Sequence, residues 1–364
     1  MTPMFTWPSR HVLCALFLGT ASIGVVGVSC IGTDGDVLRG EVLAHLADEV
    51  FLPAHVRFQT DAAALATVVA DHCAGAKSEP SAAQAAWKSV RAEWSVTAAF
   101  AFGPVITQMQ AGPLDFWPVR SDTIEAKLLE APASIDAAWI DGLGTSAKGM
   151  PALEYLLFAD VLAAGTPRCA YATALAADIS RRSEDLASAW AIEAEALKTA
   201  GEPDSGYASE KVAIDAIVNA TIENLYRMVK DKLDRPLGNL TGGEPDPLAL
   251  ESRFSGTARD DLEANLRGFA TVYLGADGEP GGEPGLGALI AARDPDLDRR
   301  ILAQHVVARD ALAAVPLPFA AALTDHRDDV QRARDEIDAL RRLIKLDVAS
   351  LLGVTLSLSD NDGD

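Results

Sequence analysis

The sequence predicts an all-α protein of about eight main helices, packed as two helical bundles. Alanine is very frequent among the 364 residues, and β-branched and aromatic residues are sparse outside short runs, a composition that favours helix. The alternation of polar and apolar residues that marks strands is nearly absent, whereas apolar residues recur at helical spacing through most of the chain. Hydrophobic residues make up 49%, which is enough for a real core. We expect an N-terminal bundle over residues 37–205 and a C-terminal bundle over residues 206–356.

The first 29 residues have the layout of a secretory signal peptide. A basic start precedes an apolar run over residues 12–28, and Cys30 follows. Val28-Ser29-Cys30 looks like the end of a bacterial lipoprotein signal, in which the cysteine is lipidated after cleavage, although Gly27 stands where leucine is usual. A plain signal peptide cut near the same place is the alternative. Residues 30–36 then form a short tether, and no later segment has the roughly 20 uninterrupted apolar residues of a membrane span.

The cysteines also fit an exported protein. Cys14 leaves with the signal peptide and Cys30 would carry the lipid, so Cys73 and Cys169 remain as an even pair in an oxidising compartment. We expect them to form a disulfide, which would close a loop of roughly a hundred residues and contribute about 4 kcal/mol in the chain-entropy model. Two buried thiols are the alternative, and four scattered cysteines do not make a zinc site.

The N-terminal bundle begins with a helical pattern that ends at Cys73 and that Pro53 should kink or restart. Ser81 is a plausible N-cap for the next helix. That helix carries Trp87, Arg91 and Trp94, which are four and three residues apart and therefore share one face. The face is either part of a binding site or a core seam in which Arg91 pairs with a buried acid.

Two further stretches of this half carry candidate functional residues. Residues 114–120 form a loop, because Gly112-Pro113 and Pro118 break regular structure, and this loop contains Trp117 and Arg120. After a Lys-Gly break, a helix should begin near Pro151, which places Glu154 in its first turn, where the helix dipole favours an anion. Glu154 stands in an almost wholly apolar run, so we expect it to be paired or to bind something. A long helix, a loop and the C-terminal bundle follow.

The C-terminal bundle is a series of helices separated by breaks rich in glycine and proline. The helical period returns from Ser209, and residues 236–247 predict a long functional loop or an interdomain crossing. Three more helical segments follow, the last with apolar residues at near-heptad spacing and charges on its other face. Their expected bounds are residues 252–273, 298–314 and 323–352. The tail over residues 357–364 has the composition of a disordered segment.

The charge balance excludes one class of partner. The chain has 52 acidic and 31 basic residues, a net charge of -21, so it would repel nucleic-acid phosphates. An acidic surface attracts cations, but it is more often a solubility feature.

Several stretches together resemble the imelysin-like family, also called peptidase family M75. They are Trp87…Arg91…Trp94, Phe102-Gly103-Pro104, Phe116-Trp117-Pro118-Val119-Arg120, the run from Lys148 to Phe158, and Ser252-Arg253-Phe254-Ser255, in the order of the family. The resemblance implies an exported two-bundle helical protein of bacteria, often a lipoprotein and frequently associated with iron uptake. Founding members were described as metallopeptidases, but many members are thought not to cleave proteins.

The resemblance also implies a metal motif, Gly-x-His-x-x-Glu, which this chain matches only in part. Gly149 fits the glycine and Glu154 the glutamate, but Pro151 stands at the histidine position. A histidine and a glutamate three apart on a helix make a workable half-site for zinc or iron, and proline has no donor atom in its side chain. His55 could face the site as a second ligand, although a lone boundary histidine is the simpler interpretation. The cofactor stays unknown, with iron or zinc possible.

These observations together predict a ligand site where the helix that begins near Pro151 meets the tryptophan face and the 114–120 loop. The expected site contains one carboxylate, Glu154, held by Arg91 or Arg120. Its expected residues are Glu154, Arg91, Trp87, Trp94, Trp117, Arg120, Gly149 and Arg253.

The function that we expect is a non-enzymatic binding protein of the bacterial cell envelope in iron or metal acquisition. It would be anchored at Cys30, face the periplasm or cell surface, and bind a metal ion or an iron-uptake partner protein. The alternatives are a metallopeptidase, which needs three ligands and a general base, and a structural envelope module.

Overall fold

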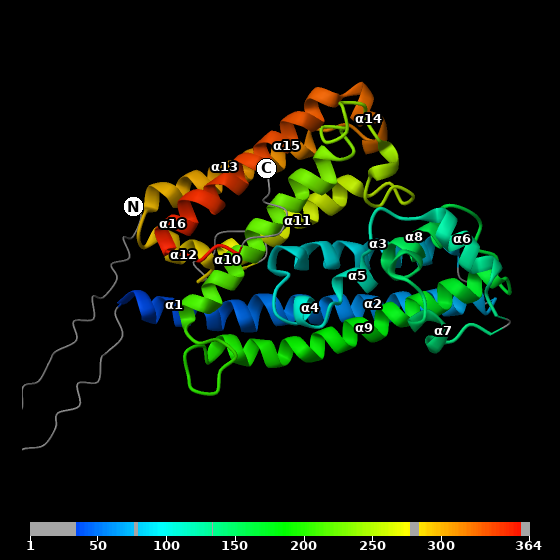
Figure 1. Ribbon diagram of the computed structural model, residues 1–364, viewed down its shortest axis with the longest axis horizontal. Coiled ribbons are helices and arrows are strands. Elements are labelled where there is room, and N and C mark those ends of the chain that lie inside the picture. The colour runs from blue at the N-terminus through cyan, green and yellow to red at the C-terminus, as the bar shows by residue number, and fades with distance from the viewer. Residues whose placement is uncertain (1–33, 76–78, 133, 277–283, 358–364) are drawn as a thin grey trace, which may run out of the picture.

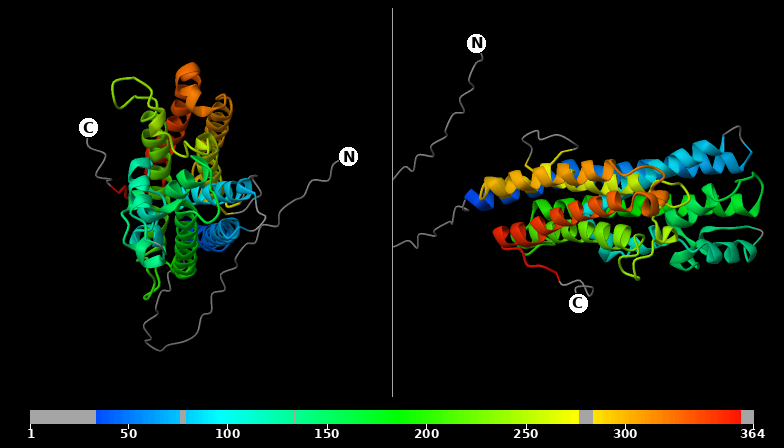
Figure 2. Two further views of the ribbon diagram at one scale, coloured as in Figure 1. Left: turned by 90° about the vertical axis from the view of Figure 1, so that its right-hand side faces the viewer. Right: turned by 90° about the horizontal axis from the view of Figure 1, so that it is seen from above.

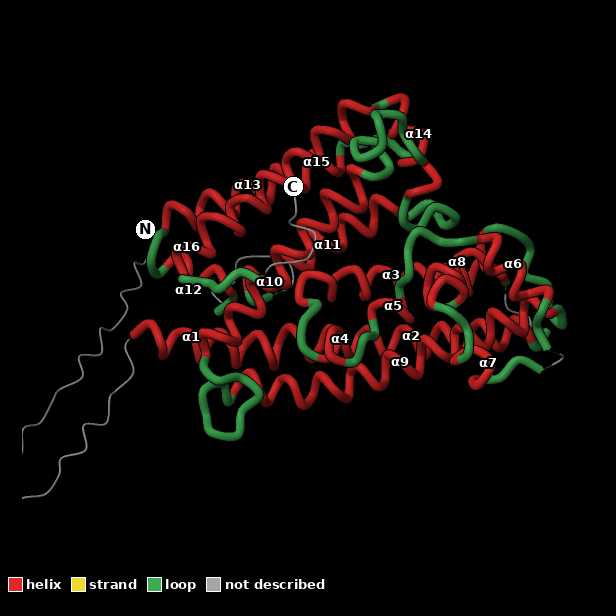
Figure 3. The backbone as a smooth tube through the Cα atoms, in the orientation of Figure 1, coloured by secondary structure: helices red, strands yellow, loops and turns green. Residues whose placement is uncertain are grey.

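The computed structural model describes residues 34–75, 79–132, 134–276 and 284–357, and all regular secondary structure in these ranges is helical (Figure 3). This confirms the all-α prediction, with more helical segments than the eight main helices expected. The predicted signal peptide, Cys30, most of the tether and residues 358–364 lie outside the described residues. No helix in the described ranges is long and apolar enough to cross a membrane.

The first group of helices packs around α2. The chain runs from α1 (Asp34–His45) through a π-helical segment, η1 (Leu46–Phe51), into α2 (Leu52–Cys73), and α3 (Pro80–Thr97) and α9 (Pro167–Lys198) pack against α2. Pro53 lies in the first turn of α2, directly after the π-helical segment, so the predicted interruption is present. The prediction for Ser81 was wrong, because Pro80 occupies the first helical position and Glu79 is the N-cap residue.

Short helices connect α3 to α9. They are η2 (Ala98–Phe100), α4 (Pro104–Thr107), α5 (Ala111–Leu114), α6 (Ser121–Leu129), α7 (Ala137–Asp141), η3 (Thr145–Ala147) and α8 (Gly149–Phe158). Helix α8 packs against α9 and α3. A disulfide joins Cys73 at the end of α2 to Cys169 in the first turn of α9, with the two Cα atoms 5.4 Å apart, which confirms the predicted pair.

The second group contains the helices from residue 210 onward. Its members are α10 (Glu210–Arg227), η4 (Met228–Asp234), η5 (Pro247–Ala249), α11 (Ala258–Leu274), α12 (Leu286–Ala291), α13 (Pro295–Ala313), α14 (Phe319–Asp325), α15 (Arg327–Arg342), η6 (Leu343–Val348) and α16 (Ala349–Leu352). Ser209 caps α10 by accepting a hydrogen bond from the N–H of Val212. The last predicted helix is divided at His326 and passes through a π-helical segment, η6.

The two groups of helices lie against each other along α3 and α11, and the molecule is elongated (Figures 1 and 2). The contact between α3 and α11 is close at Gly268, where an added Cβ atom would collide with the backbone carbonyl of Val96. Helix α1 also packs against α10 and α12 of the second group. The boundary between residues 205 and 206 stays a prediction.

Candidate functional site

The tryptophan face of α3 is buried as the spacing predicted. Trp87, Arg91 and Trp94 are 1%, 2% and 8% exposed. The indole of Trp87 donates a hydrogen bond of 3.0 Å to the carbonyl of Met150 on α8, and that of Trp94 donates one of 2.8 Å to Oδ2 of Asp115. The face therefore fixes both α8 and the segment after α5 against α3.

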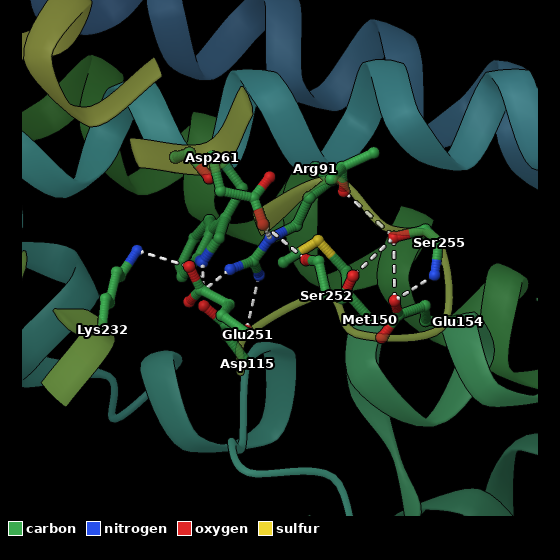
Figure 4. Close-up of polar contacts among 12 residues, drawn as sticks. Arg91, Asp115, Met150, Glu154, Lys232, Glu251, Ser252, Ser255 and Asp261 are labelled. Atoms are coloured by element: carbon green, nitrogen blue, oxygen red, sulfur yellow. Dashed lines mark hydrogen bonds and ion pairs between the residues drawn. The ribbon is translucent and has the colours of Figure 1, made fainter. Parts of the chain in front are cut away.

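Arg91 lies at the centre of a buried charge network (Figure 4). Its guanidinium forms ion pairs with three carboxylates: Asp115 through Nη1 at 2.6 Å, Glu251 through Nη2 at 2.6 Å, and Asp261 through Nε at 3.2 Å. Asp115 follows α5, whereas Glu251 and Asp261 belong to the second group of helices. The network thus connects the two groups through one cation.

A second cation completes the network. The amine of Lys232 lies 2.8 Å from Glu251 Oε2 and 2.8 Å from Oδ1 of Asn265. Asn265 in turn donates a hydrogen bond of 2.7 Å to the carbonyl of Ser95 on α3. The network, defined here as Arg91, Asp115, Lys232, Glu251 and Asp261, therefore contains two cations and three carboxylates.

The surplus carboxylate is Asp261. Burial raises its pKa to about 7, the charge of Glu251 adds to the rise, and the charge of Arg91 opposes it. Burial also disfavours the charged form of Glu251, but Arg91 and Lys232 outweigh it and lower the pKa of Glu251 to about 2. At neutral pH a proton on Asp261 would balance the network, because two cations then face two carboxylates.

One short turn connects this network to Glu154. Glu251 belongs to the network, and the hydroxyl of the next residue, Ser252, donates a short hydrogen bond to Asp261. Three residues on, the backbone N–H and hydroxyl of Ser255 each donate to Glu154 Oε1 at 2.8 Å, and the N–H of Phe254 donates at 3.0 Å. Ser252 adopts a φ of 48°, an uncommon conformation for a residue with a side chain. The sharp turn at Ser252 lets one short segment contact both the network and Glu154.

The predicted salt bridge of Glu154 was wrong. Glu154 is 1% exposed, as its apolar flanks suggested, but in the described part of the chain no ion pair joins it to Arg91 or Arg120. Burial raises the pKa of Glu154, and the hydrogen bonds from Ser255 oppose the rise. Because α8 begins at Gly149, Glu154 lies in its second turn rather than the first. Backbone donors, and not a guanidinium, satisfy this carboxylate.

Two predicted arginines lie elsewhere. Arg120 is exposed and its guanidinium stacks on the ring of Phe116, 5.4 Å from the centroid. Arg253 stacks on Phe254 at 4.6 Å and donates a hydrogen bond to the carbonyl of Leu248. The structure therefore assigns both arginines to the packing of the loops around the network.

Gly149 has a structural reason to be glycine. Its φ is +79°, and an added Cβ atom would lie 2.5 Å from the carbonyl oxygens of Pro113 and Leu114. The start of α8 and the segment after α5 therefore approach each other more closely than any side chain allows. This contact holds Asp115 beside Arg91.

A cavity of about 270 Å³ opens beside the network, between α3 with the segment around Trp117 and α10 with η4. The network residues Arg91, Asp115, Lys232 and Glu251 line one side of it, and Trp94, Phe116, Trp117 and Arg227 line others. Of the predicted site residues, the structure thus brings Arg91, Trp94 and Trp117 to one cavity. Glu154, Gly149, Arg120, Arg253 and Trp87 do not line it.

Sequence reasoning missed Asp115, Lys232, Glu251, Asp261 and Arg227. The signal available for Asp115 was its place in the loop that also contains Trp117. Glu251 lies in a turn and Lys232 in a π-helical segment, where side-chain direction does not follow ordinary helical spacing, whereas Asp261 lies on α11 and Arg227 ends α10.

The sequence model of the Imelysin family (Peptidase_M75) matches residues 51–346. The chain belongs to the imelysin family. It is 27% identical over 335 residues to iron-regulated protein A of Synechococcus elongatus, which covers 90% of this chain and 89% of that protein.

Two crystal structures share the fold, each at 21% sequence identity. One is a putative iron-regulated protein A precursor from Parabacteroides distasonis, with a TM-score of 0.75 over 87% of this chain and 95% of that one. The other is an imelysin-like protein from Psychrobacter arcticum, with a TM-score of 0.74 over 89% and 98%.

The metal motif proposed for imelysin proteins does not fit this chain. Pro151 offers no ligand, and Oε1 of Glu154 already accepts three hydrogen bonds. His55 is fully buried, with Nδ1 2.8 Å from the carbonyl of Phe51 and its ring stacked on Trp190, and burial lowers its pKa to about 3. Across the described ranges no three His, Cys, Asp or Glu side chains are grouped to hold a metal ion. The described residues therefore give no support to the predicted metal site of Glu154 and His55.

Proposed function

We propose that this imelysin-family chain is a non-enzymatic binding protein of the bacterial cell envelope that takes part in iron or metal acquisition. The observation that carries the proposal is the cavity beside the Arg91 network. It has aromatic walls and a charged side, and both groups of helices contribute to it. Concave sites with apolar walls and a few placed polar groups are the usual form of small-molecule sites.

The relatives support the iron-related part of the proposal. The name of the Synechococcus elongatus protein describes it as iron-regulated, and the similarity covers 90% of this chain. The Parabacteroides distasonis relative is described as a precursor, which agrees with export. The predicted signal peptide and lipidation at Cys30 add the anchor, so we propose attachment by lipid and exposure to the periplasm or cell surface.

The side chains around the cavity and around Glu154 fit a binding protein better than a metallopeptidase. A metallopeptidase needs three protein ligands and a general base at one metal. The described residues bring no such group together, and Glu154 is occupied by backbone donors. The network instead offers fixed charges around a cavity, an arrangement that orients a ligand.

Equilibrium dialysis of the purified mature chain against iron, zinc and haem tests this proposal. Binding of any of them would support the iron-related role, and Glu154→Ala should keep that binding, because Glu154 does not line the cavity. Binding by none would remove iron, zinc and haem as the bound species and leave another small molecule or a partner protein. Cleavage of a protein substrate that a chelator abolishes would contradict the non-enzymatic role.

A further inference from the structure

The cavity beside the network has flat apolar walls. Trp94, Phe116 and Trp117 line it together with several alanines, among them Ala98 and Ala111. The guanidinium of Arg235 lies over the ring of Trp117 at 5.5 Å from the centroid, which fixes that ring in place. With a volume of about 270 Å³, the cavity is slightly smaller than the sites that hold drug-sized molecules. Its size and aromatic lining suit one small planar molecule.

Both oxygens of each network carboxylate that lines the cavity already face a partner within the protein. Asp115 pairs with Arg91 through one oxygen and accepts the indole N–H of Trp94 through the other. Glu251 pairs with Arg91 through Oε1 and with Lys232 through Oε2. The negative charge of both carboxylates is therefore directed at Arg91 and Lys232, which leaves the network less suited to binding a cation.

Two buried side-chain donors among the residues that line the cavity have no hydrogen-bond partner among the described residues. The indole N–H of Trp117 is buried and has no hydrogen-bond partner among the described residues, and the same holds for the hydroxyl of Ser95, which is 1% exposed. Among the described residues Arg227 forms one long ion pair, from Nε to Asp231 at 3.8 Å, and its side chain is 51% exposed, so its terminal nitrogens can reach a ligand. A buried donor without an acceptor costs about 1 to 3 kcal/mol, so a ligand that supplies acceptors recovers that cost.

We propose that this cavity binds a small planar carboxylate, of the class of aromatic monocarboxylic acids. The ring lies against Trp94, Phe116 and Trp117, and the carboxylate accepts from Arg227 and from the indole of Trp117. An arginine fork matches a carboxylate with two parallel hydrogen bonds. Ser95 supplies a further donor on the α3 side. The inference rests on the proposed function, because it names the chemical class of the molecule that the binding protein takes.

Glu223 is the remaining carboxylate that lines the cavity, and it makes the charge dependence testable in both directions. A carboxylate ligand near Glu223 experiences repulsion that a neutral glutamine would not exert. Arg227→Gln should therefore weaken binding and Glu223→Gln should strengthen it. Arg309, an arginine on α13 that is more than half exposed and does not line the cavity, supplies the matched control Arg309→Gln.

Isothermal titration of the mature, disulfide-bonded chain with benzoate tests the inference. We expect benzoate to bind, benzamide to bind at least about tenfold more weakly, and Arg227→Gln to weaken benzoate by at least about tenfold, as for one lost charge-assisted hydrogen bond. Trp117→Phe keeps the ring and removes the N–H, and should weaken benzoate severalfold. Arg309→Gln should match the parent chain. Far-UV circular dichroism confirms that each variant is folded.

Three results would overturn the inference: no heat with millimolar benzoate, equal affinity for benzoate and benzamide, or an unchanged affinity in folded Arg227→Gln. Dialysis with iron, zinc and haem on the same preparation separates this inference from the proposed function. Metal or haem binding without benzoate binding overturns the ligand class alone. Benzoate binding without any of the three supports the ligand class and removes the iron-related part of the proposed function.

Discussion

Asp261→Asn is expected to remove a pH-dependent loss of stability. Asp261 accepts hydrogen bonds from Arg91 Nε and from the Ser252 hydroxyl, and both reach the same oxygen, Oδ2. The amide oxygen of asparagine can occupy that position and keep both bonds. Asparagine is also neutral, as Asp261 is when its proton balances the network. The substitution therefore changes the titration while it preserves the geometry.

The direction of the pH effect follows from the raised pKa. Asp261 has a pKa of about 7 in the folded chain against an ordinary value of 3.8, so its stabilising contribution is complete below about pH 4 and is lost as pH rises through 7. Glu251, with a pKa of about 2, stays ionised over that range. Relative to the parent chain, Asp261→Asn should gain unfolding free energy on the order of 2 kcal/mol between about pH 5 and about pH 8.

Urea denaturation followed by circular dichroism measures this difference at several pH values, with the disulfide intact. Other titrating groups affect parent and variant alike and cancel in the difference. A difference that stays constant from pH 5 to pH 8, or that shrinks as pH rises, would refute the assignment of the surplus proton to Asp261.

Three further changes test the rest of the structure by urea denaturation. Gly149→Ala should lower the unfolding free energy by about 3 kcal/mol, because the added Cβ meets two backbone carbonyls. Gly75→Ala is the control: its φ is also +79° but there is open space around it, so it should cost only about 1 kcal/mol. Equal costs would contradict the close approach at Gly149. Arg91→Met should cost about 3 to 5 kcal/mol by leaving buried carboxylates without their cation, and a cost under about 1 kcal/mol would show that the network is not buried. Replacing Cys73 and Cys169 by serine opens a loop of 96 residues and should cost about 4 kcal/mol, and an unchanged midpoint would contradict the crosslink.

The sequence was most informative where spacing alone decides geometry. Residues three and four apart share a helix face whatever surrounds them, so Trp87, Arg91 and Trp94 were correctly placed together. The expected oxidising compartment and the even number of remaining cysteines predicted the disulfide between Cys73 and Cys169. The first prediction depends on local helix geometry, and the second on the small number of cysteines left to pair.

The partners of Glu154 show why the rest of the candidate site could not be predicted from the sequence. The prediction that this carboxylate must be buried and satisfied was correct, but its donors are mainly backbone N–H groups. Every residue except proline carries such a group, so no residue type marks the donor in a sequence. The network partners of Arg91 are likewise 24 to 170 residues away along the chain, in segments whose meeting point only the fold determines.

The cavity beside the Arg91 network, and not Glu154, is the binding site that we propose. A crystal structure of the mature chain soaked with bromobenzoate tests it most directly, because the anomalous signal of bromine marks the ligand. We predict a peak in the cavity lined by Trp94 and Trp117, with the carboxylate on Arg227. A peak at Glu154, or no peak in the cavity, would contradict the account.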